Sequence, residues 1–432
     1  MALEVLREYA GQFQQVGTFD GDSAADNSTW TFQYSPSYLE SANAQAISHS
    51  LPLREEPFTR FEYQGFFEGM APEGRTRTEL ARRFHVSPSD FLGLLSHLGS
   101  ECIGAIRFRA TSDDIEEPHF TPITKDHLAD LCHAPVEAVV NDLSSTRLSL
   151  AGAQSKIGVY IDPLHIDAEK HPDPEHWYEP RGTAPSTHIL KIASSGSQLA
   201  GNELACMELA KACGLEIAAS STIPEFEQLF VSQRFDRWFP EEEPSNHLDG
   251  HIVPLRLHQE DFCQALGWPS YAKYEIEDTV CYAQVIGNLI AKTSADSIAD
   301  KRKFARMTLF NYFIGNCDNH LKNHSFLYSP SWDAAKLAPM YDAVCTTVLG
   351  YDRKLGFCIG DHQIIDDITF DDWRLFGEDL RLGKNVISRL YQDMRDSIME
   401  GVEERRTILP DAASDQLERI TQDMKPRLRP WN

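Results

Sequence analysis

The amino-acid sequence predicts an α+β protein with a β-rich N-terminal part and a mostly helical C-terminal part. Within the first 66 residues, β-branched and aromatic residues cluster between turn-forming residues, as at positions 29–34. From about residue 258 onward, apolar residues recur at intervals of three and four, as at positions 298–314. That spacing is typical of helices with one buried face.

Length and composition limit the class of protein. The chain has 432 residues, of which 42% are hydrophobic and 24% charged, as in an ordinary soluble globular protein of several domains. The net charge of −25 argues against direct nucleic-acid binding, which requires clustered Lys and Arg. Nine cysteines without a C-x-x-C motif indicate reduced thiols. With no signal-peptide pattern and no long apolar run, we expect a cytoplasmic protein that does not span a membrane.

Changes of pattern along the chain predict three domains, at residues 1–110, 111–255 and 256–432. In the first, we expect strands at 16–19, 29–34 and 58–63, followed by a pair of helices. Ser87 is the expected N-cap of the second helix, with Pro88 at its first position. The helix pair could be a DNA-binding helix-turn-helix, but residues 88–95 contain no basic side chain, so simple packing is the alternative.

A polar loop follows the apolar helical run at 307–314. Gly315 and Asn316 end that run, which places Asp318 and Asn323 on a loop at a helix end. A further acidic residue, Asp342, follows a short apolar segment. Phosphotransferases of the protein-kinase type use an Asp, an Asn five residues later and a second Asp in this order, as proton acceptor and two Mg²⁺ ligands.

Two other interpretations of this loop remain open. Asp, Asn and Lys after a helix commonly form a polar loop with a cap and no further role. Asp318, His320 and His324 could instead bind a metal ion in a hydrolase, although no second cluster of ligands accompanies them.

The middle third contains a possible phosphate site. Residues 148–161 suggest a strand, a tight loop of small residues and a second strand. Main-chain N–H groups of such a loop can cradle phosphates, and Lys156 would add positive charge, although small-residue hairpins are common. Lys191 lies on a predicted strand at 187–192, and Glu203 lies in the first turn of the helix that follows. In kinases, a strand Lys contacts the nucleotide phosphates and pairs with such a Glu.

Taken together, these motifs resemble the HipA family of bacterial serine/threonine kinases, and the resemblance covers nearly the whole chain. Its motifs are residues 149–156, 188–192, 233–236, 259–264, 315–323 and 339–342. The N-terminal stretch 16–104 also resembles that family's N-terminal domain. Ser155 and Gln233 stand where the family usually has an acidic residue.

The resemblance implies a two-lobed, protein-kinase-like fold and a role for each matching residue. Asp318 would be the catalytic base, and Asn323 and Asp342 would be the Mg²⁺ ligands. The residues implied in nucleotide binding are Ala151, Gly152, Ala153, Gln154, Ser155, Lys156, Lys191, Gln233, Arg234, Phe235, His320, Lys322 and Asn323. Glu203 would be the partner of Lys191. Ser149 matches a serine that these kinases autophosphorylate, which ejects the loop and inactivates the enzyme.

The resemblance also implies a toxin of a toxin–antitoxin system that transfers phosphate from ATP, with Mg²⁺, to a protein hydroxyl. An aminoacyl-tRNA synthetase or another translation protein would be the substrate class. A HipB-like helix-turn-helix antitoxin would be the partner and would provide the contact with operator DNA. The alternative is a catalytically inactive, kinase-like corepressor, and the presence of Lys191, Asp318, Asn323 and Asp342 argues against it.

Overall fold

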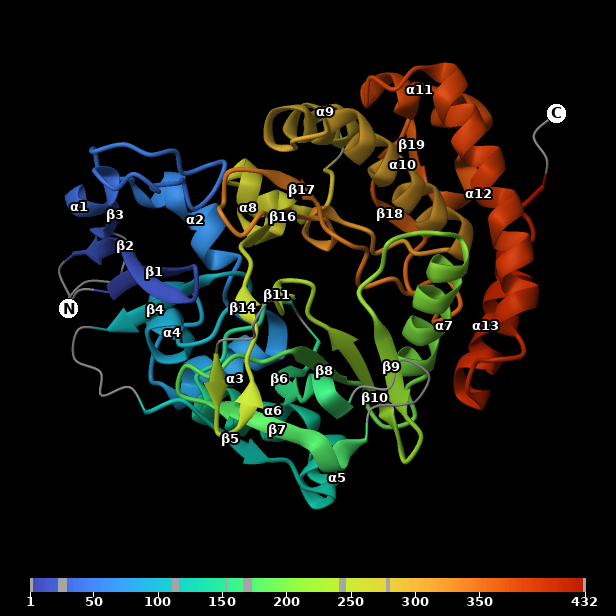
Figure 1. The fold of residues 1–432 in the computed structure, drawn as a ribbon. Helices are drawn as coiled ribbons and strands as arrows, with labels where there is room; N and C mark the ends of the chain where they lie inside the picture. The colour runs from blue at the N-terminus through green and yellow to red at the C-terminus, as the bar shows by residue number, and fades with distance from the viewer. Residues whose placement is uncertain are drawn as a thin grey trace. The chain divides into compact units, whose positions relative to one another are not determined.

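The computed structural model describes residues 3–21, 29–110, 116–152, 154–165, 173–240, 246–276 and 280–429 (Figure 1). The chain forms two compact units, and neither is a continuous stretch. The first comprises Met1–Ser195, Val231–Ser270 and Leu327–Ala334, and the second comprises Gly196–Phe230, Tyr271–Phe326 and Ala335–Asn432. The three predicted domains stay a prediction.

A four-stranded antiparallel sheet in the order β3-β2-β1-β4 begins the first unit (Figure 1). Its strands are β1 (Leu3–Tyr9), β2 (Gln12–Asp20), β3 (Thr31–Tyr34) and β4 (Ile106–Ala110). Phe19 of β2 and Phe32 of β3 pack edge-to-face on Phe67 of helix α2 (Arg60–Glu68), with ring centroids 4.7 and 5.1 Å away. These aromatic residues form the core between sheet and helix.

Two local predictions in this region are wrong. Residues 58–63 do not form a strand: Phe58 makes an isolated bridge with Phe32, and helix α2 begins at Arg60. The Glu62 carboxylate accepts the Thr59 N–H at 2.8 Å and so caps the helix start. The N-cap of helix α4 (Phe91–Leu98) is Asp90 and not Ser87, since Asp90 Oδ1 accepts the Gly93 N–H at 2.7 Å.

Helices α3 (Gly74–Arg83) and α4 form the predicted helix pair. Most of α4 is buried and apolar, as its residues Phe91, Leu92, Leu94, Leu95 and Leu98 are all in the core. A recognition helix must leave one face open to DNA. The structure therefore favours the packing interpretation of this pair.

A second sheet occupies the rest of the first unit. Strands β5 (His119–Pro122), β7 (Trp177–Arg181), β6 (Lys156–Ile161) and β8 (His188–Ile192) lie side by side in that order. Strand β10 (Phe226–Gln233) is the next neighbour of β8, and its residues 231–233 belong to this unit. Helices α5 (Lys125–His133) and α6 (Pro135–Thr146) precede β6.

The predicted strand before the small-residue loop is wrong, because Leu148 forms only an isolated bridge with Glu101.

The second unit is mostly helical (Figure 1). Its helices are α7 (Leu199–Ala212), α9 (Tyr282–Thr293), α10 (Ser297–Ile314), α11 (Phe370–Asp379), α12 (Lys384–Arg405) and α13 (Asp411–Met424). Helix α10 is buried along most of its length, and Phe313 near its end packs on Tyr391 of α12 with ring centroids 5.0 Å apart. This packing fixes the end of α10, from which the predicted catalytic loop begins.

The remaining elements are short. They are α1 (Pro36–Leu39), β9 (Ser220–Ile223), β11 (Arg237–Trp238), β12 (His247–Leu248), β13 (His251–Ile252), β14 (Leu255–Arg256), β15 (Gln259–Asp261), α8 (Phe262–Leu266), β16 (Ser325–Tyr328), β17 (Ala335–Leu337), β18 (Lys354–Ile359) and β19 (His362–Ile364). The nine cysteines all lie among the described residues, and none of them forms a disulfide. In the described part of the chain, no helix is both long and apolar enough to cross a membrane.

Candidate active site

The predicted catalytic loop begins at a helix end. Gly315 caps α10 in the left-handed conformation, with φ +80°, and its N–H bonds to main-chain carbonyls of the last helical turn. A Cβ at this position would lie only 2.2 Å from Thr347 Oγ1. Conformation and space therefore both require glycine here.

Asp318 and Asn323 are joined within the loop. The Asn323 side-chain amide donates from Nδ2 to the Asp318 main-chain carbonyl at 2.9 Å. The Asp318 N–H donates to Asn316 Oδ1 at 3.1 Å, and the short 3₁₀ turn Leu321–Asn323 completes the loop. Asp318 is exposed, whereas Asn323 is buried. The structure thus fixes the main chain of the exposed Asp318 relative to the Asn predicted to bind metal.

Burial decides the electrostatics of the loop's other groups. Burial raises the pKa of the Cys317 thiol to about 11, so this cysteine stays a neutral thiol at physiological pH. Burial lowers the pKa of His324 to about 3, and its ring contacts Phe304 edge-on. His320 is also buried. No group of three or more His, Cys, Asp or Glu side chains that could hold a metal ion occurs among the described residues, which argues against a site built on Asp318, His320 and His324.

Lys322 is fixed through its main chain. The Tyr341 hydroxyl donates to the Lys322 carbonyl at 2.9 Å and also hydrogen-bonds to Ser325 Oγ at 2.6 Å. Tyr341 immediately precedes Asp342, so one side chain joins the catalytic loop to the segment that contains the second predicted metal ligand.

Asp342 itself has a left-handed backbone, with φ +55°. This conformation is uncommon for a residue other than glycine, and such strain is concentrated at functional sites. Two residues before Asp342, Met340 is held from both sides: its N–H donates to Glu216 O at 2.8 Å and its carbonyl accepts the Ala218 N–H at 2.9 Å. The segment that contains Asp342 is therefore fixed by the chain that follows α7.

Three anchoring residues near the loop were not predicted from the sequence. Asn202 of α7 is fully buried, and its Oδ1 accepts the Cys345 N–H at 2.8 Å. Thr346 Oγ1 accepts the Cys317 N–H at 2.8 Å and donates to the Gly315 carbonyl at 3.1 Å. Arg427 donates from Nε to the Phe313 carbonyl at 3.0 Å. The only sequence signal was Asn202, a polar residue within an apolar stretch of helix.

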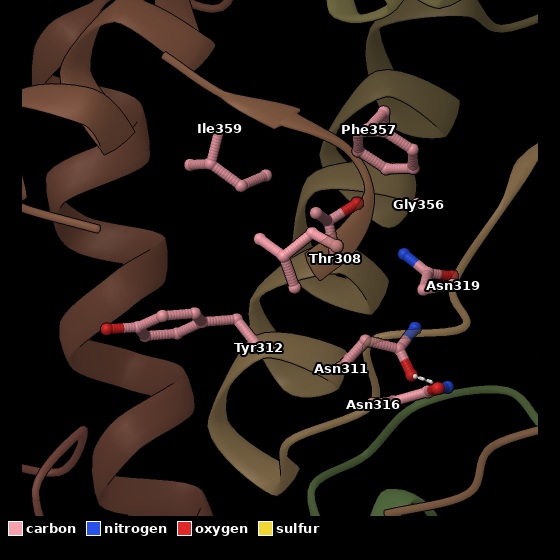
Figure 2. Close-up of a pocket in the computed structure, with 9 residues that line it drawn as sticks. Thr308, Asn311, Tyr312, Asn316, Asn319, Gly356, Phe357 and Ile359 are labelled. Atoms are coloured by element: carbon pink, nitrogen blue, oxygen red, sulfur yellow. Dashed lines mark hydrogen bonds between the residues drawn. The ribbon is translucent and has the colours of Figure 1, made fainter. Parts of the chain in front are cut away.

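A small pocket lies behind the loop (Figure 2). It is lined by Thr308, Asn311, Tyr312, Asn316, Asn319, Leu355, Gly356, Phe357 and Ile359. Asn316 Nδ2 donates to Asn311 Oδ1 at 2.9 Å across its floor (Figure 2). A Cβ on Gly356 would lie 2.3 Å from the Asn319 carbonyl oxygen. Strand β18 therefore approaches the catalytic loop as closely as the main chain permits.

In the first unit, the predicted phosphate loop is held at its start. Ser149 is fully buried: its N–H donates to Glu101 O and its hydroxyl donates to Met70 O, both at 2.8 Å. Gly152, with φ +103°, accepts the Glu73 N–H at 3.2 Å. Ala151, Gln154, Ser155 and Lys156 are half-buried, and Ala153 lies outside the described residues.

Two lysines meet beside this loop. Lys156 of β6 is the antiparallel register partner of Lys191 of β8. Side chains directly opposite each other lie on the same face of a sheet, and like charges in such a pair are unfavourable. The Lys156 Nζ lies 2.6 Å from where a Gly152 Cβ would be, so its ammonium group is against the loop. Lys191 is 5% exposed. The sheet thus concentrates positive charge at the end of the small-residue loop.

The predicted hinge residues 233–235 follow β10. Gln233 is exposed and Phe235 is half-buried, whereas the Arg234 side chain is buried. The Arg234 guanidinium donates to Asp236 and Glu101, and to the Cys102 carbonyl. Because these bonds occupy the guanidinium, a nucleotide could contact Arg234 only through its main chain. The assignment of the hinge stays a prediction.

Arg234 belongs to a buried charge network within the first unit. Its members are Arg234, Arg237, Arg256, Glu8, Glu101 and Asp236. Burial alone would raise the pKa of Glu101, but Arg237, Arg256 and Arg234 lower it to about 2. Three cations and three carboxylates balance, which is the condition under which buried charges are tolerated.

Some predicted pairings cross between the two units. Glu203 is buried in α7 of the second unit, whereas Lys191 belongs to the first. Their pairing stays a prediction, as does the approach of the phosphate loop to Asp318.

Within the second unit, Asn323 and Asp342 offer an amide and a carboxylate oxygen, which are the ligand types that Mg²⁺ prefers. Because Asn323 Nδ2 donates to the Asp318 carbonyl, Oδ1 is the side-chain atom of Asn323 that could bind a metal ion.

Comparisons with known proteins extend these observations. A family model described as the HipA N-terminal domain matches residues 10–109, and one described as the HipA-like C-terminal domain matches residues 148–402. The "Putative kinase Y4mE" of Sinorhizobium fredii is 32% identical over 398 residues, covering 90% of this chain and 88% of that protein. The "Serine/threonine-protein kinase toxin HipA" of Shewanella oneidensis is 25% identical over 416 residues, covering 93% and 89%.

Among solved structures, HipA from a Shewanella oneidensis MR-1 complex of HipA, HipB and operator DNA is similar over 99% of this chain and 96% of that chain. The TM-score is 0.79 and the identity 23%. This likeness confirms the predicted α+β fold, with a β-plus-helix N-terminal domain and a mostly helical C-terminal part.

Proposed function

This chain belongs to the HipA family, and we propose that it is an ATP- and Mg²⁺-dependent protein serine/threonine kinase that acts as the toxin of a toxin–antitoxin pair. The bond between Asn323 Nδ2 and the Asp318 carbonyl carries this proposal. It sets a carboxylate that can accept a proton and an amide oxygen that can bind Mg²⁺ at one fixed spacing on one loop. Phosphoryl transfer depends chiefly on such positioning and on charge neutralisation.

Each residue has one task in the proposed reaction. Asp318 accepts the proton of the substrate hydroxyl, which strengthens that oxygen as a nucleophile. Asn323 and Asp342 would hold Mg²⁺, which would supply charge neutralisation at the phosphates. Tyr341 and Thr346 keep the two segments that contain these residues in place through their bonds to Lys322 and Gly315.

The lysine pair supports binding of a polyphosphate. Two ammonium groups on one face of a sheet are unfavourable by themselves, and an anion between them removes the repulsion. Main-chain N–H groups of residues 151–155 would add donors to the same phosphates. Residues 233–235 would contact the adenine, and His320 and Lys322 would approach the phosphates from the catalytic loop.

Ser149 would be the control point. Its buried hydroxyl, bound to Met70 O, leaves no space for a phosphate group, so a phosphorylated Ser149 requires the loop to leave its place. A phosphoserine adds about −1.5 to −2 charges at pH 7, which repel the phosphates of ATP. Autophosphorylation would therefore switch the kinase off.

The proposed partner is a HipB-like helix-turn-helix antitoxin. The net charge of −25 makes direct binding of operator DNA unfavourable, so the antitoxin would provide that contact. The solved relative comes from a complex of HipA, HipB and operator DNA, which supports this proposal. The substrate would be a cytoplasmic translation protein, such as an aminoacyl-tRNA synthetase.

The test is transfer of radiolabelled phosphate from ATP and Mg²⁺ to the chain itself and to casein. Asp318→Asn keeps the size of the side chain and removes its basicity, so transfer should fall by about 10²- to 10⁴-fold. Asp371→Asn is the control, because Asp371 is 82% exposed and pairs with Arg374 at the surface. Transfer by Asp318→Asn at the wild-type rate would reject Asp318 as the base. A wild-type protein that binds an antitoxin and transfers no phosphate would favour the inactive corepressor.

A further inference from the structure

A tyrosine from a distant segment contacts the proposed base. The Tyr274 hydroxyl donates to Asp318 Oδ1 at 2.5 Å. Its ring lies edge-on to His320, with the centroids 5.0 Å apart and the planes at 80°. Both partners belong to the catalytic loop, and all three residues belong to the second unit. Tyr274 thus contacts the loop at the carboxylate and at the side chain two residues later.

The neighbouring residue fixes the main chain of Tyr274. Glu275 is buried, and its carboxylate accepts the N–H groups of Cys358 at 2.7 Å and Tyr282 at 3.2 Å. Its own N–H donates to Gly356 O at 2.8 Å. Glu275 therefore attaches this segment to strand β18 and to the start of helix α9.

A second tyrosine reinforces this attachment. The Tyr282 hydroxyl donates to the carbonyls of Ala272 at 2.9 Å and Tyr274 at 3.2 Å. Gly356, which receives the Glu275 N–H, is the residue that also lies directly against Asn319 of the catalytic loop. The Tyr274 segment and the catalytic loop are therefore fixed to the same strand, and the contact between Tyr274 and Asp318 is part of a built framework.

A general base must present one carboxylate oxygen to the acceptor hydroxyl in a defined direction. An exposed Asp side chain rotates about two bonds, and rotation spreads its oxygens over several directions. A donor fixed by the scaffold restricts that rotation and stabilises the ionised form. Tyr274 is such a donor, because its main chain is fixed and its hydroxyl donates to one oxygen of the carboxylate.

We propose that Tyr274 is a positioning residue that orients the Asp318 carboxylate for proton acceptance from the substrate hydroxyl. This inference rests on the proposed role of Asp318 as the base. Tyr274 acts through Asp318 and touches neither nucleotide nor metal. Its loss should therefore lower kcat and leave nucleotide binding as it is.

The decisive variant is Tyr274→Phe, which removes the hydroxyl and keeps the ring against His320. We expect kcat for casein to fall by roughly 5- to 20-fold, as for loss of a partly exposed hydrogen bond to a charged group. KM for ATP and the Kd of Mg²⁺-ATP from calorimetry should stay within about twofold of the wild type, because no nucleotide contact is lost. Tyr271→Phe is the control: Tyr271 lies three residues earlier and is 79% exposed, and this variant should match the wild type.

Two results would overturn the inference. Unchanged kcat in Tyr274→Phe would show that Asp318 needs no such support, and a higher kcat would show that the tyrosine hydroxyl occupies the place of the acceptor. The double variant Asp318→Asn/Tyr274→Phe should lose no further activity beyond Asp318→Asn, since the two residues act as one unit. An active Asp318→Asn would reject the proposed base, whereas an inactive Asp318→Asn with a fully active Tyr274→Phe would reject only this inference.

Discussion

Lys156 and Lys191 stand directly opposite each other on two neighbouring antiparallel strands, β6 and β8. The two ammonium-bearing side chains share one face of the sheet at the end of the small-residue loop. A bound phosphate group would interact favourably with both charges, so this lysine pair is the feature of the first unit that most directly supports a phosphate-binding role.

Lys156→Met should change stability and affinity in opposite directions. Removing one of two opposed charges should stabilise the nucleotide-free protein by about 0.2–1 kcal/mol. The same change should weaken ATP binding by about tenfold, because a close charge-assisted contact is lost. Thermal unfolding without ATP and calorimetric titration with Mg²⁺-ATP measure the two effects. Lys292→Met, on the exposed surface of α9, should change neither.

Asp342→Ala should make nucleotide binding insensitive to Mg²⁺. The variant removes one of two proposed oxygen ligands and leaves Lys156, Lys191 and the phosphate loop in place. Titrations with ATP at several Mg²⁺ concentrations should show the wild type gaining affinity with the metal and the variant gaining little. Equal gains in both proteins would mean that Asp342 does not hold the metal.

Ser149 should become phosphorylated between molecules, since its hydroxyl is buried and donates to Met70 O while the loop is in place. With Ser149→Ala as the donor enzyme and Asp318→Asn as the acceptor, mass spectrometry should find phosphate on Ser149 of the acceptor. The phosphorylated acceptor should then lose ATP binding, owing to the added negative charge. Phosphate found only at other residues, or normal ATP binding by the phosphorylated form, would contradict the proposed switch.

Glu260 should make the first unit less stable as pH rises. It accepts hydrogen bonds from Ser48, Tyr328 and His49, and burial raises its pKa from 4.5 to about 7. Between these values the folded state holds a proton that the unfolded state releases, so stability falls with rising pH. The loss should be about 3 kcal/mol in total. Urea unfolding at pH 5 and pH 8 should show this difference in the wild type relative to Glu260→Gln, in which the group does not titrate. The same difference in both proteins would assign the pH dependence to other groups.

Glu101→Gln should lower the free energy of unfolding of the first unit far more than a Glu→Gln substitution at the surface does. Glu101 is 2% exposed and pairs with Arg234, Arg237 and Arg256, so its neutralisation leaves buried arginines uncompensated. The expected loss is about 3–5 kcal/mol. Glu79→Gln breaks an exposed pair with Arg82 and should cost less than about 1 kcal/mol. Denaturant titrations compare the two, and similar losses would mean that the network contributes little.

The sequence predicts well what is encoded locally. Gly315 ends the apolar helix and Asp318 follows on its loop, because helix caps depend on a few adjacent residues. Residues 58–63 show the opposite case. Their aromatic side chains suggest a strand, but the cap formed by Thr59 and Glu62 starts a helix that buries Tyr63 and leaves Phe61 exposed. Thr59 and Glu62 mark a helix start in the sequence, whereas the strand prediction depends on the aromatic content of this stretch.

What could not be predicted depends on contacts between distant segments. Tyr274 and Thr346 reach the catalytic loop from 44 and 29 residues away. Nothing in their immediate neighbours marks them as special. The charge network likewise joins Glu8 to Arg256 across 248 residues. Arg234 was predicted to bind nucleotide from its position in a motif, whereas the structure shows its guanidinium engaged in that network.

The bond from Arg427 to the Phe313 carbonyl has a consequence for how the protein is made. The two residues are 114 positions apart, and Phe313 lies in the last turn of the helix before the catalytic loop. On the ribosome, that turn emerges long before Arg427 has been added to the chain. Throughout that interval the nascent polypeptide lacks one support of its own catalytic loop. The loop of the proposed kinase would thus gain this support only after Arg427 has been added.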